Sequence, residues 1–225
     1  MSDSLESVRI EPKEKPDAAV ILMHGLGADG HDFESLVPEL RLPPLPSIRW
    51  IFPHAPVRPV TINGGYRMRA WFDILAIDSH AAENETGIRE SAAAIGALVR
   101  AEQEDGIASD RIILAGFSQG GAMALFTALR WPERLAGVAA LSCWLPLADT
   151  LRAEAHRANS AAPVFMAHGT MDQTVPLDLA EGTRELLHAN GCAVKWLTYP
   201  MAHGVSDAEV ADLREWLLGR VGLRK

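Results

Sequence analysis

Long apolar stretches, cysteine and basic runs are all scarce in this chain of 225 residues. No stretch reaches the ~18 consecutive apolar residues that span a bilayer. Residues 1–7 carry acids where a secretory signal has an apolar segment. Cys143 and Cys192 are the only cysteines, too few for a disulfide scaffold. We therefore expect a cytoplasmic protein that does not insert stably into membranes.

Positive charge is also in deficit. The chain has 21 Lys and Arg against 29 Asp and Glu, which gives a formal net charge of −8. Because nucleic-acid-binding proteins normally present a basic face, we expect no nucleic-acid partner. The eight histidines show no ligand spacing and the H-E-x-x-H motif is absent, so we expect no metal and no organic cofactor.

The apolar residues that are present alternate between strand and helix patterns. They make up 48% of the sequence, enough for one globular domain over residues 1–225 with a charged leader at 1–17. The alternation predicts an α/β fold, with a mostly parallel central sheet and helices on both faces. Residues 53–83 show no sustained period and are predicted to form a long irregular loop. The predicted strands cover residues 18–23, 48–52, 112–114, 135–142, 163–168 and 193–199, and the predicted helices 33–40, 84–105, 121–131, 177–189 and 206–217.

A candidate nucleophile lies between a strand pattern and a helix pattern. Gly116-Phe117-Ser118-Gln119-Gly120 follows the apolar run 112–114 and leads into helical residues from 121 onward. A G-x-S-x-G motif in this context is typical of a nucleophile elbow, where glycines flank a serine whose strained backbone holds its hydroxyl above the end of a sheet. The alternative is a serine in an ordinary glycine-rich turn, and partner residues must decide between the two.

A serine nucleophile needs a histidine base and a carboxylate that orients the base. In a doubly wound sheet, groups that meet lie at the carboxyl ends of strands. Asp172 follows the strand predicted at 163–168, and His203 follows the last predicted strand. We assign them as acid and base, whereas His24 and His168 end strands and are expected to make structural hydrogen bonds. The chain order Ser118, Asp172, His203 is that of α/β-hydrolases.

The glycine-rich loop after the first predicted strand has two interpretations. Gly25-Leu26-Gly27-Ala28-Asp29-Gly30 matches the G-x-G-x-x-G fingerprint of dinucleotide-binding proteins. That fingerprint expects an acid at the end of the next strand, and residues 50–54 contain none. A hydrolase instead needs backbone N–H groups for the oxyanion of a tetrahedral intermediate. We assign those of Leu26 and Gln119.

Together these motifs resemble the phospholipase/carboxylesterase family of α/β-hydrolases, which includes bacterial carboxylesterases and acyl-protein thioesterases. The resemblance covers nearly the whole chain and is carried by six motifs. It implies the same triad and oxyanion loop. The motifs are residues 24–30, Phe52-Pro53-x-Ala55-Pro56, Trp71-Phe72-Asp73-Ile74, residues 116–123, His168-Gly169-Thr170-x-Asp172-x-x-Val175-Pro176 and His203-Gly204.

We therefore expect a serine carboxylesterase that acts on short- to medium-chain esters. The connection from Trp144 to Ala161 is too short for a large cap domain, which predicts an open site. An acyl-protein thioesterase or lysophospholipase is the alternative, and a noncatalytic protein on the same scaffold is a third hypothesis. A homodimer is one arrangement that the sequence permits. The residues predicted to line the acyl groove are Trp71, Phe72, Leu75, Trp144, Leu145 and Val175.

Overall fold

A seven-stranded sheet forms the centre of the computed structural model, which describes residues 5–77 and 82–222. Its strands run in the order β1-β3-β2-β6-β7-β8-β9, and only β1 is antiparallel to its neighbour. The mostly parallel α/β fold predicted from the sequence is confirmed. The strands are β1 (Ser7–Ile10), β2 (Ala18–Met23), β3 (Ile48–Pro53), β6 (Ile112–Phe117), β7 (Gly137–Leu141), β8 (Pro163–Gly169) and β9 (Ala193–Tyr199).

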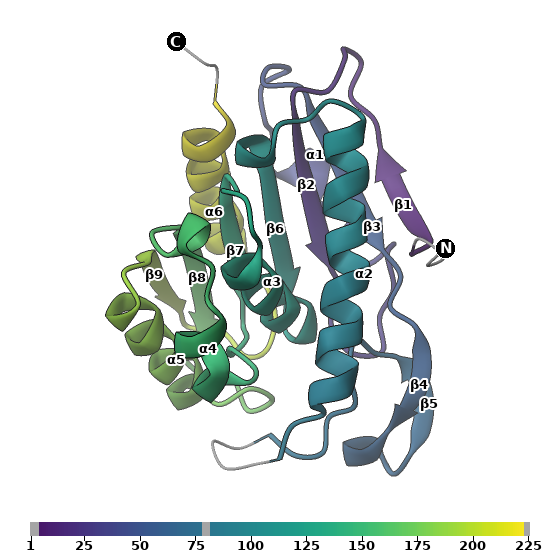
Figure 1. Cartoon of the computed structure of the whole chain (residues 1–225), viewed down its shortest axis with the longest axis vertical. Coiled ribbons are helices and arrows are strands. Elements are labelled where there is room, and N and C mark those ends of the chain that lie inside the picture. Colours follow the sequence, from purple (N-terminus) through teal and green to yellow (C-terminus); the bar gives the residue numbers. More distant parts are fainter. Residues whose placement is uncertain (1–4, 78–81, 223–225) are drawn as a thin grey trace.

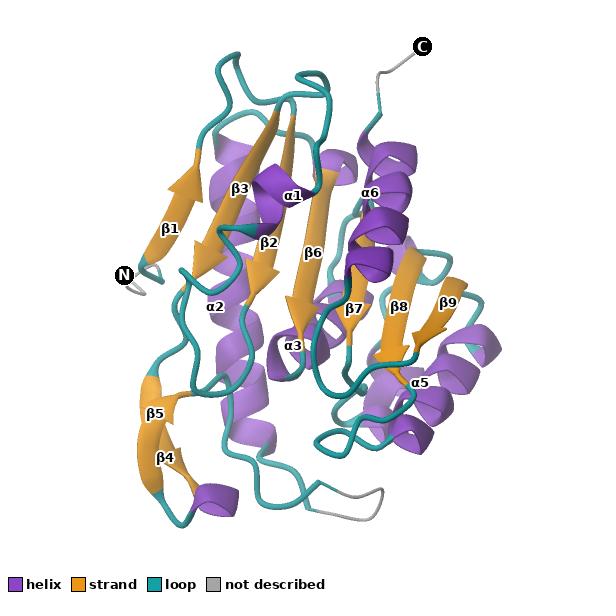
Figure 2. Cartoon of the chain, turned by 180° about the vertical axis from the view of Figure 1, so that it is seen from behind, coloured by secondary structure: helices purple, strands orange, loops and turns teal. Residues whose placement is uncertain are grey.

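Helices cover both faces of the sheet (Figure 1). Helices α2 (Glu85–Glu104), α3 (Gln119–Arg130) and α5 (Leu177–Ala189) pack on one face, and the view from behind shows α1 (Leu36–Glu39) and α6 (Asp207–Val221) on the other (Figure 2). Each face has its own apolar cluster, one including Ile95 of α2 and the other Trp216 of α6. The inner strands are buried on both sides, which explains their unbroken apolar sequences.

The segment 53–83 differs from its prediction as an irregular loop. It contains a separate hairpin of β4 (Val57–Val60) and β5 (Tyr66–Arg69), joined through the 3-10 turn Thr61–Asn63. Only Val60 of these two strands is buried. A hairpin that faces solvent on both sides has no alternation of apolar and polar residues, so its strands leave no period in the sequence. The hairpin projects near the carboxyl ends of the parallel strands (Figure 2).

Two other elements depart from the sequence predictions. The charged leader supplies β1, which pairs with β3 through the register Val8–Phe52. As an edge strand, β1 is short and partly exposed, so it needs no apolar run that composition would reveal. The helix predicted over residues 33–40 has only the four residues of α1.

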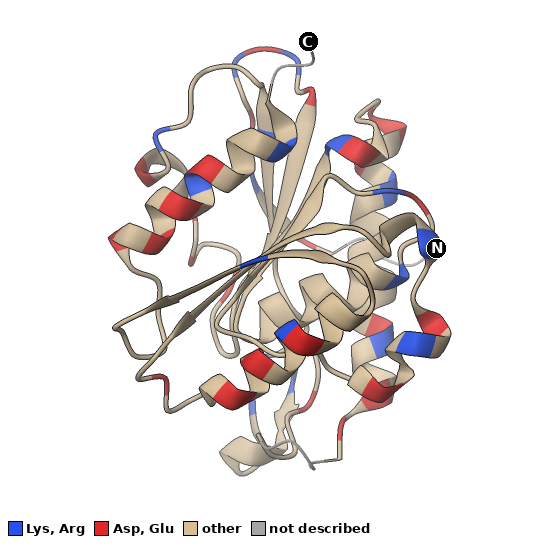
Figure 3. Cartoon of the chain, turned by 90° about the vertical axis from the view of Figure 1, so that its left-hand side faces the viewer, with Lys and Arg blue, Asp and Glu red and all other residues tan. Residues whose placement is uncertain are grey.

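The connection between β7 and β8 carries no large cap domain. It holds the 3-10 turns Ala148–Thr150 and Arg157–Asn159 and the single-turn helix α4 (Leu151–Glu154). Acidic and basic residues of the described ranges lie mainly on the helices and connecting segments, with the two signs interspersed (Figure 3).

Candidate active site

Ser118 occupies the sharp turn between β6 and α3. Its backbone has φ 54° and ψ −122°, and its N–H donates to Leu141 O on the neighbouring strand at 2.8 Å. A Cβ at Gly116 would lie 2.2 Å from the carbonyl carbon of Gly120, and one at Gly120 would lie 2.1 Å from Met23 O. Both flanking glycines are therefore required for the chain to turn this tightly.

Asp172 and His203 come together from the ends of β8 and β9. The His203 Nδ1–H donates to Asp172 Oδ2 at 2.7 Å. The other carboxylate oxygen, Oδ1, accepts the N–H groups of Thr174 and Val175, both at 2.9 Å. These bonds use both oxygens of a side chain that is 0% exposed, so the acid is held in one orientation.

His203 lies against the elbow. Its ring centroid is 4.7 Å from that of Phe117, the residue before Ser118, and its side chain is 19% exposed. Because Nδ1 bonds to the carboxylate, Nε2 is left as the basic nitrogen. Within the described residues, the Ser118 hydroxyl makes no hydrogen bond to another residue. Catalytic hydrogen bonds are often long or poorly aligned in free enzymes and tighten only when substrate binds.

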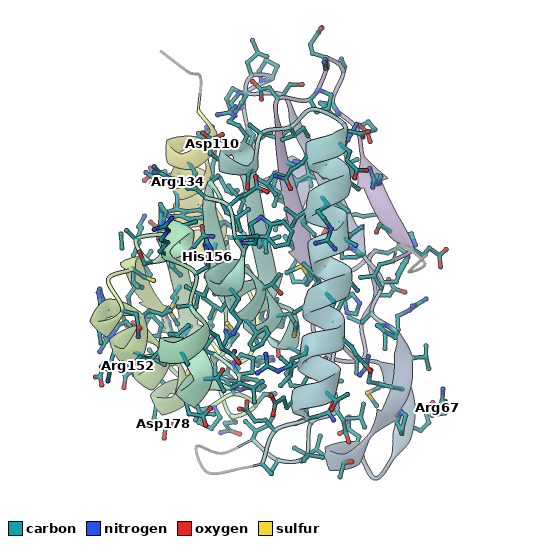
Figure 4. All side chains as sticks on the ribbon, in the orientation of Figure 1. Arg67, Asp110, Arg134, Arg152, His156 and Asp178 are labelled. Atoms are coloured by element: carbon teal, nitrogen blue, oxygen red, sulfur yellow. The ribbon has the colours of Figure 1, made fainter. Side chains whose placement is uncertain are left out.

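Two further histidines at strand ends are buried and structural, as their positions suggested. His168 Nε2 bonds to Val175 O at 2.9 Å and lies 3.5 Å from Asp172 Oδ2. Burial lowers the pKa of both His168 and His24. Asp178 is exposed in the first turn of α5 (Figure 4), and the side chain of His156 accepts the N–H of Ala158.

The glycine loop follows β2 directly beside the elbow. A Cβ at Gly25 would lie 3.5 Å from Ser118 Cβ, so the chain carrying Leu26 passes close to the nucleophile. Gly27 has φ 80° and its N–H donates to Arg69 O at 2.9 Å. The loop leads only to the four-residue α1, so it lacks the long helix whose N-terminus binds a pyrophosphate in dinucleotide-binding proteins.

The side chain of Gln119 has a role that sequence reasoning missed. Its Oε1 accepts the N–H of Trp71 at 2.8 Å, and its Nε2 donates to Phe72 O at 2.7 Å. The Trp71 indole N–H donates to His24 O at 2.9 Å. Trp71 and Gln119 are both 0% exposed. Nothing in the spacing of these residues signals the contacts, because 47 residues or more separate the partners.

The residues predicted to line an acyl groove fall into two groups. Phe72, Leu75 and Trp144 do line one pocket, and the rings of Phe72 and Trp144 meet edge to face at 6.3 Å. Trp71, Leu145 and Val175 are at most 3% exposed and do not line this pocket. Trp71 instead holds the loops around the elbow.

Glu83 is a pocket residue that the sequence did not single out. Its Oε2 accepts the N–H of Leu147 at 2.7 Å, and the Trp144 indole N–H lies 3.5 Å from Oε1. Burial raises the pKa of Glu83. The carboxylate thus ties the segment before α2 to the connection after β7, across the pocket that both line.

Residues 5–77 and 82–222 contain no group of three or more His, Cys, Asp or Glu placed to hold a metal ion. Within the same ranges, none of the helices is both long and apolar enough to cross a bilayer.

Comparison with known proteins matches this chain to a family and to individual relatives. A model of the phospholipase/carboxylesterase family matches residues 5–218. The chain is 36% identical to acyl-protein thioesterase 1 of Cryptococcus neoformans, over 97% of this chain and 98% of that protein. It is 41% identical to the Neurospora crassa protein of the same name, over 91% and 87%. The crystal structure of acyl-protein thioesterase 2 from Zea mays superposes with a TM-score of 0.85, at 31% identity over 96% and 99% of the two chains.

Proposed function

Because the chain belongs to the phospholipase/carboxylesterase family of α/β-hydrolases, we propose that it is a serine esterase with Ser118, His203 and Asp172 as its catalytic triad. The observation that carries this proposal is the pairing of His203 with Asp172 at 2.7 Å beside the strained turn of Ser118. A turn that merely contained serine would need neither partner. Esterases and acyl-protein thioesterases of this family are serine hydrolases, so the remaining questions are which residues act and on which acyl donor.

In the first half of the reaction, Ser118 Oγ attacks the carbonyl carbon of the ester while His203 Nε2 takes its proton. Asp172 stabilises the imidazolium that forms, because its Oδ2 already accepts the Nδ1–H. The backbone N–H groups of Leu26 and Gln119 bind the oxyanion. Removing one such donor typically costs about 2.7–4 kcal/mol of transition-state stabilisation. His203 then gives its proton to the leaving alcohol or thiol, which leaves the acyl group on Ser118.

In the second half, water attacks the acyl-enzyme. His203 takes the proton from water, and the oxyanion forms in the same place. When the intermediate collapses, the carboxylic acid leaves and Ser118 Oγ regains its proton from His203. No group is consumed, so the triad returns to its starting state.

The acyl donor that we propose is a carboxylic ester of short to medium chain length. We place its acyl group against Phe72, Leu75 and Trp144, whose pocket also includes Ile74, Ile77 and Leu179; this pocket has room for about one water molecule, so its walls must move apart to admit the chain. Acyl-protein thioester hydrolysis is a second candidate, favoured by the names of the relatives that match along nearly the whole chain. Faster cleavage of an acyl-cysteine peptide than of the matching ester would support the second candidate.

The nucleophile is tested by labelling with a fluorophosphonate probe, which reacts with activated serines. We expect rapid labelling of the natural chain and none of Ser118→Ala. Ser142→Ala is the control, because this serine is also buried with a positive φ, of 49°, but does not follow β6. Labelling that persists in Ser118→Ala would overturn the proposal.

A further inference from the structure

Trp71 makes hydrogen bonds near the elbow through its backbone N–H, its backbone carbonyl and its indole, although nothing in the proposed reaction uses it. Its backbone N–H donates to Gln119 Oε1 at 2.8 Å, and its indole N–H donates to His24 O at 2.9 Å. Its carbonyl accepts the hydroxyl of Ser91. All four residues are buried, with at most 3% exposed. Hydrogen bonds in such a dry environment hold groups firmly, because water cannot replace them.

The two partners of Trp71 stand beside the two proposed oxyanion donors. Gln119 is itself one donor, the first residue of α3. His24 directly follows β2, two residues before Leu26, the other donor. The backbone N–H of Trp71 therefore holds the elbow, and its indole N–H holds the glycine loop. The two bonds join the segment after β5 to the loops after β2 and β6, whose strands pair directly in the sheet.

His24 extends this connection into the glycine loop. Its Nε2 accepts the N–H of Ala55 at 3.1 Å, so its Nδ1 carries the proton and donates to Gly25 O at 2.7 Å. Burial lowers the pKa of His24, which keeps the ring in this neutral form near pH 7. The ring thus braces the peptide that joins Gly25 to Leu26, whose N–H is the proposed donor.

We propose that His24, Trp71 and Gln119 form a clamp that sets the distance between the two oxyanion donors. Trp71 is a positioning residue in this clamp, since it touches neither substrate nor nucleophile. The inference rests on the proposed function. Oxyanion donors act only when they lie 2.7–3.1 Å from the position of the developing charge, so a small displacement of one loop weakens the transition state more than the bound substrate.

The test is Trp71→Phe, which keeps most of the ring and removes the indole N–H. We expect kcat for p-nitrophenyl butyrate to fall about tenfold or more, with KM within about twofold, because the lost stabilisation belongs to the transition state. The affinity for an alkyl trifluoromethyl ketone, which forms a tetrahedral adduct with an activated serine, should fall by the same factor. Simple loss of packing would not make these two losses equal.

A matched control removes an indole N–H that makes no bond. Trp131 is also buried, at 7% exposed, and its Nε1 has no hydrogen-bond partner within the described residues. Trp131→Phe should therefore leave kcat and the ketone affinity unchanged. If Trp71→Phe fails to fold, as judged by its thermal unfolding, Gln119→Leu cuts the clamp at its other end. We expect the same joint loss of kcat and ketone affinity.

Two results would overturn the clamp. One is a folded Trp71→Phe protein that keeps both its kcat and its ketone affinity. The other is a change confined to KM. If Ser118→Ala abolishes labelling while Trp71→Phe stays fully active, the clamp fails and the proposed function stands. Labelling that persists in Ser118→Ala means that the proposed function itself is wrong.

Discussion

The backbone of Ser118 has a φ of 54°, a conformation that residues with a Cβ seldom adopt. Such strain costs on the order of 1–3 kcal/mol and persists only where the surroundings enforce it. Here the hydrogen bond to Leu141 O and the close approach of Gly120 to Met23 O enforce it. The turn places Ser118 at the end of β6, directly after Phe117, whose ring lies 4.7 Å from that of His203.

Both carboxylate oxygens of Asp172 accept hydrogen bonds. Asp172→Asn keeps the size of the side chain but offers an amide where His203 Nδ1–H needs an acceptor. In a triad, this exchange leaves the imidazole in the wrong tautomer. We expect kcat for p-nitrophenyl butyrate to fall about 10⁴-fold with little change in KM.

Asp178→Asn is the control for this measurement, because Asp178 is exposed and bonds only to the N–H of Leu179. Its steady-state kcat should match that of the natural chain. An Asp172→Asn enzyme with more than a tenth of the natural kcat would remove Asp172 from the triad.

At the scale of elements, the pocket is assembled mostly from connecting segments. Phe72 and Leu75 lie between β5 and α2, Trp144 follows β7, and Leu179 is on α5. Glu83 ties the two connections together through Leu147 N–H. The shape of the pocket therefore depends on how two connections pack against α5, while the turn of Ser118 depends on β6, α3 and the neighbouring strands β2 and β7.

Trp144 is the half-buried wall of this pocket and stands edge to face with Phe72. Trp144→Ala should enlarge the space for an acyl chain without touching the triad. We expect kcat/KM for p-nitrophenyl octanoate to rise at least severalfold relative to p-nitrophenyl acetate, since each buried CH₂ contributes about 0.8 kcal/mol. Initial rates over the series acetate, butyrate, octanoate and palmitate measure this ratio.

Leu45→Ala supplies the comparison for the pocket variant. Leu45 is 50% exposed in the connection before β3 and lines no part of this pocket. Its chain-length profile should match the natural one. An unchanged profile in Trp144→Ala as well would place the acyl chain elsewhere.

Across the whole molecule, networks of charge join elements that are distant in sequence. Glu102 of α2 is 1% exposed and accepts hydrogen bonds from Arg9 of β1 and Arg49 of β3. Glu154 receives hydrogen bonds from Arg89 and Arg130, which lower the pKa of its carboxyl to about 2. The buried Glu102 therefore ties α2 to the sheet, whereas the partly exposed Glu154 ties α4 to α2 and α3.

Glu209 on α6 is also a buried acid, but within the described chain its carboxyl group lacks such partners. Its backbone N–H donates to Oγ of Ser206, the N-cap of the helix, at 3.3 Å. Its own carboxyl oxygens have no hydrogen-bond partner within the described residues, and the side chain is 0% exposed. Burial raises the pKa of Glu209 from 4.5 to about 8, against a smaller lowering by the nearby Ser206 N–H.

This shift makes the stability of the whole fold depend on pH. Between pH 4.5 and about 8 the unfolded chain has released the Glu209 proton while the folded chain still holds it. The unfolded state then binds fewer protons, so the free energy of unfolding falls as pH rises through this window. Glu209→Gln, which has no proton to lose, should show a shallower fall in urea unfolding measured from pH 5 to pH 8.

Glu215→Gln serves as the control, because Glu215 lies on the exposed side of the same helix. Its unfolding free energy should follow the natural pH profile. Parallel profiles for Glu209→Gln and the natural chain would contradict the prediction.

Local pattern alone indicated the fold class, the elbow and the positions of Asp172 and His203. Buried parallel strands appear in the sequence as unbroken apolar runs. Because their carboxyl ends lie at one edge of the sheet, the triad candidates can be identified without knowing the strand order. The same local reading missed β1 and the β4–β5 hairpin, whose exposed residues carry no periodic signal. An aromatic residue near a strand end has the same sequence signature whether it lines a pocket or fills the core, so local pattern did not foretell that Trp71 is 0% exposed.

What tertiary structure decided is which side chains contact one another across long separations in the chain. The bonds from Trp71 to His24 and Gln119, from Glu83 to Leu147 and from Glu102 to Arg9 join residues 47 to 93 positions apart. Such contacts depend on how helices and loops pack, which no local pattern encodes. The sequence by itself determined where the proposed nucleophile, base and acid stand at the ends of strands. Only the folded chain determined how the loops that carry the proposed oxyanion donors are held in place.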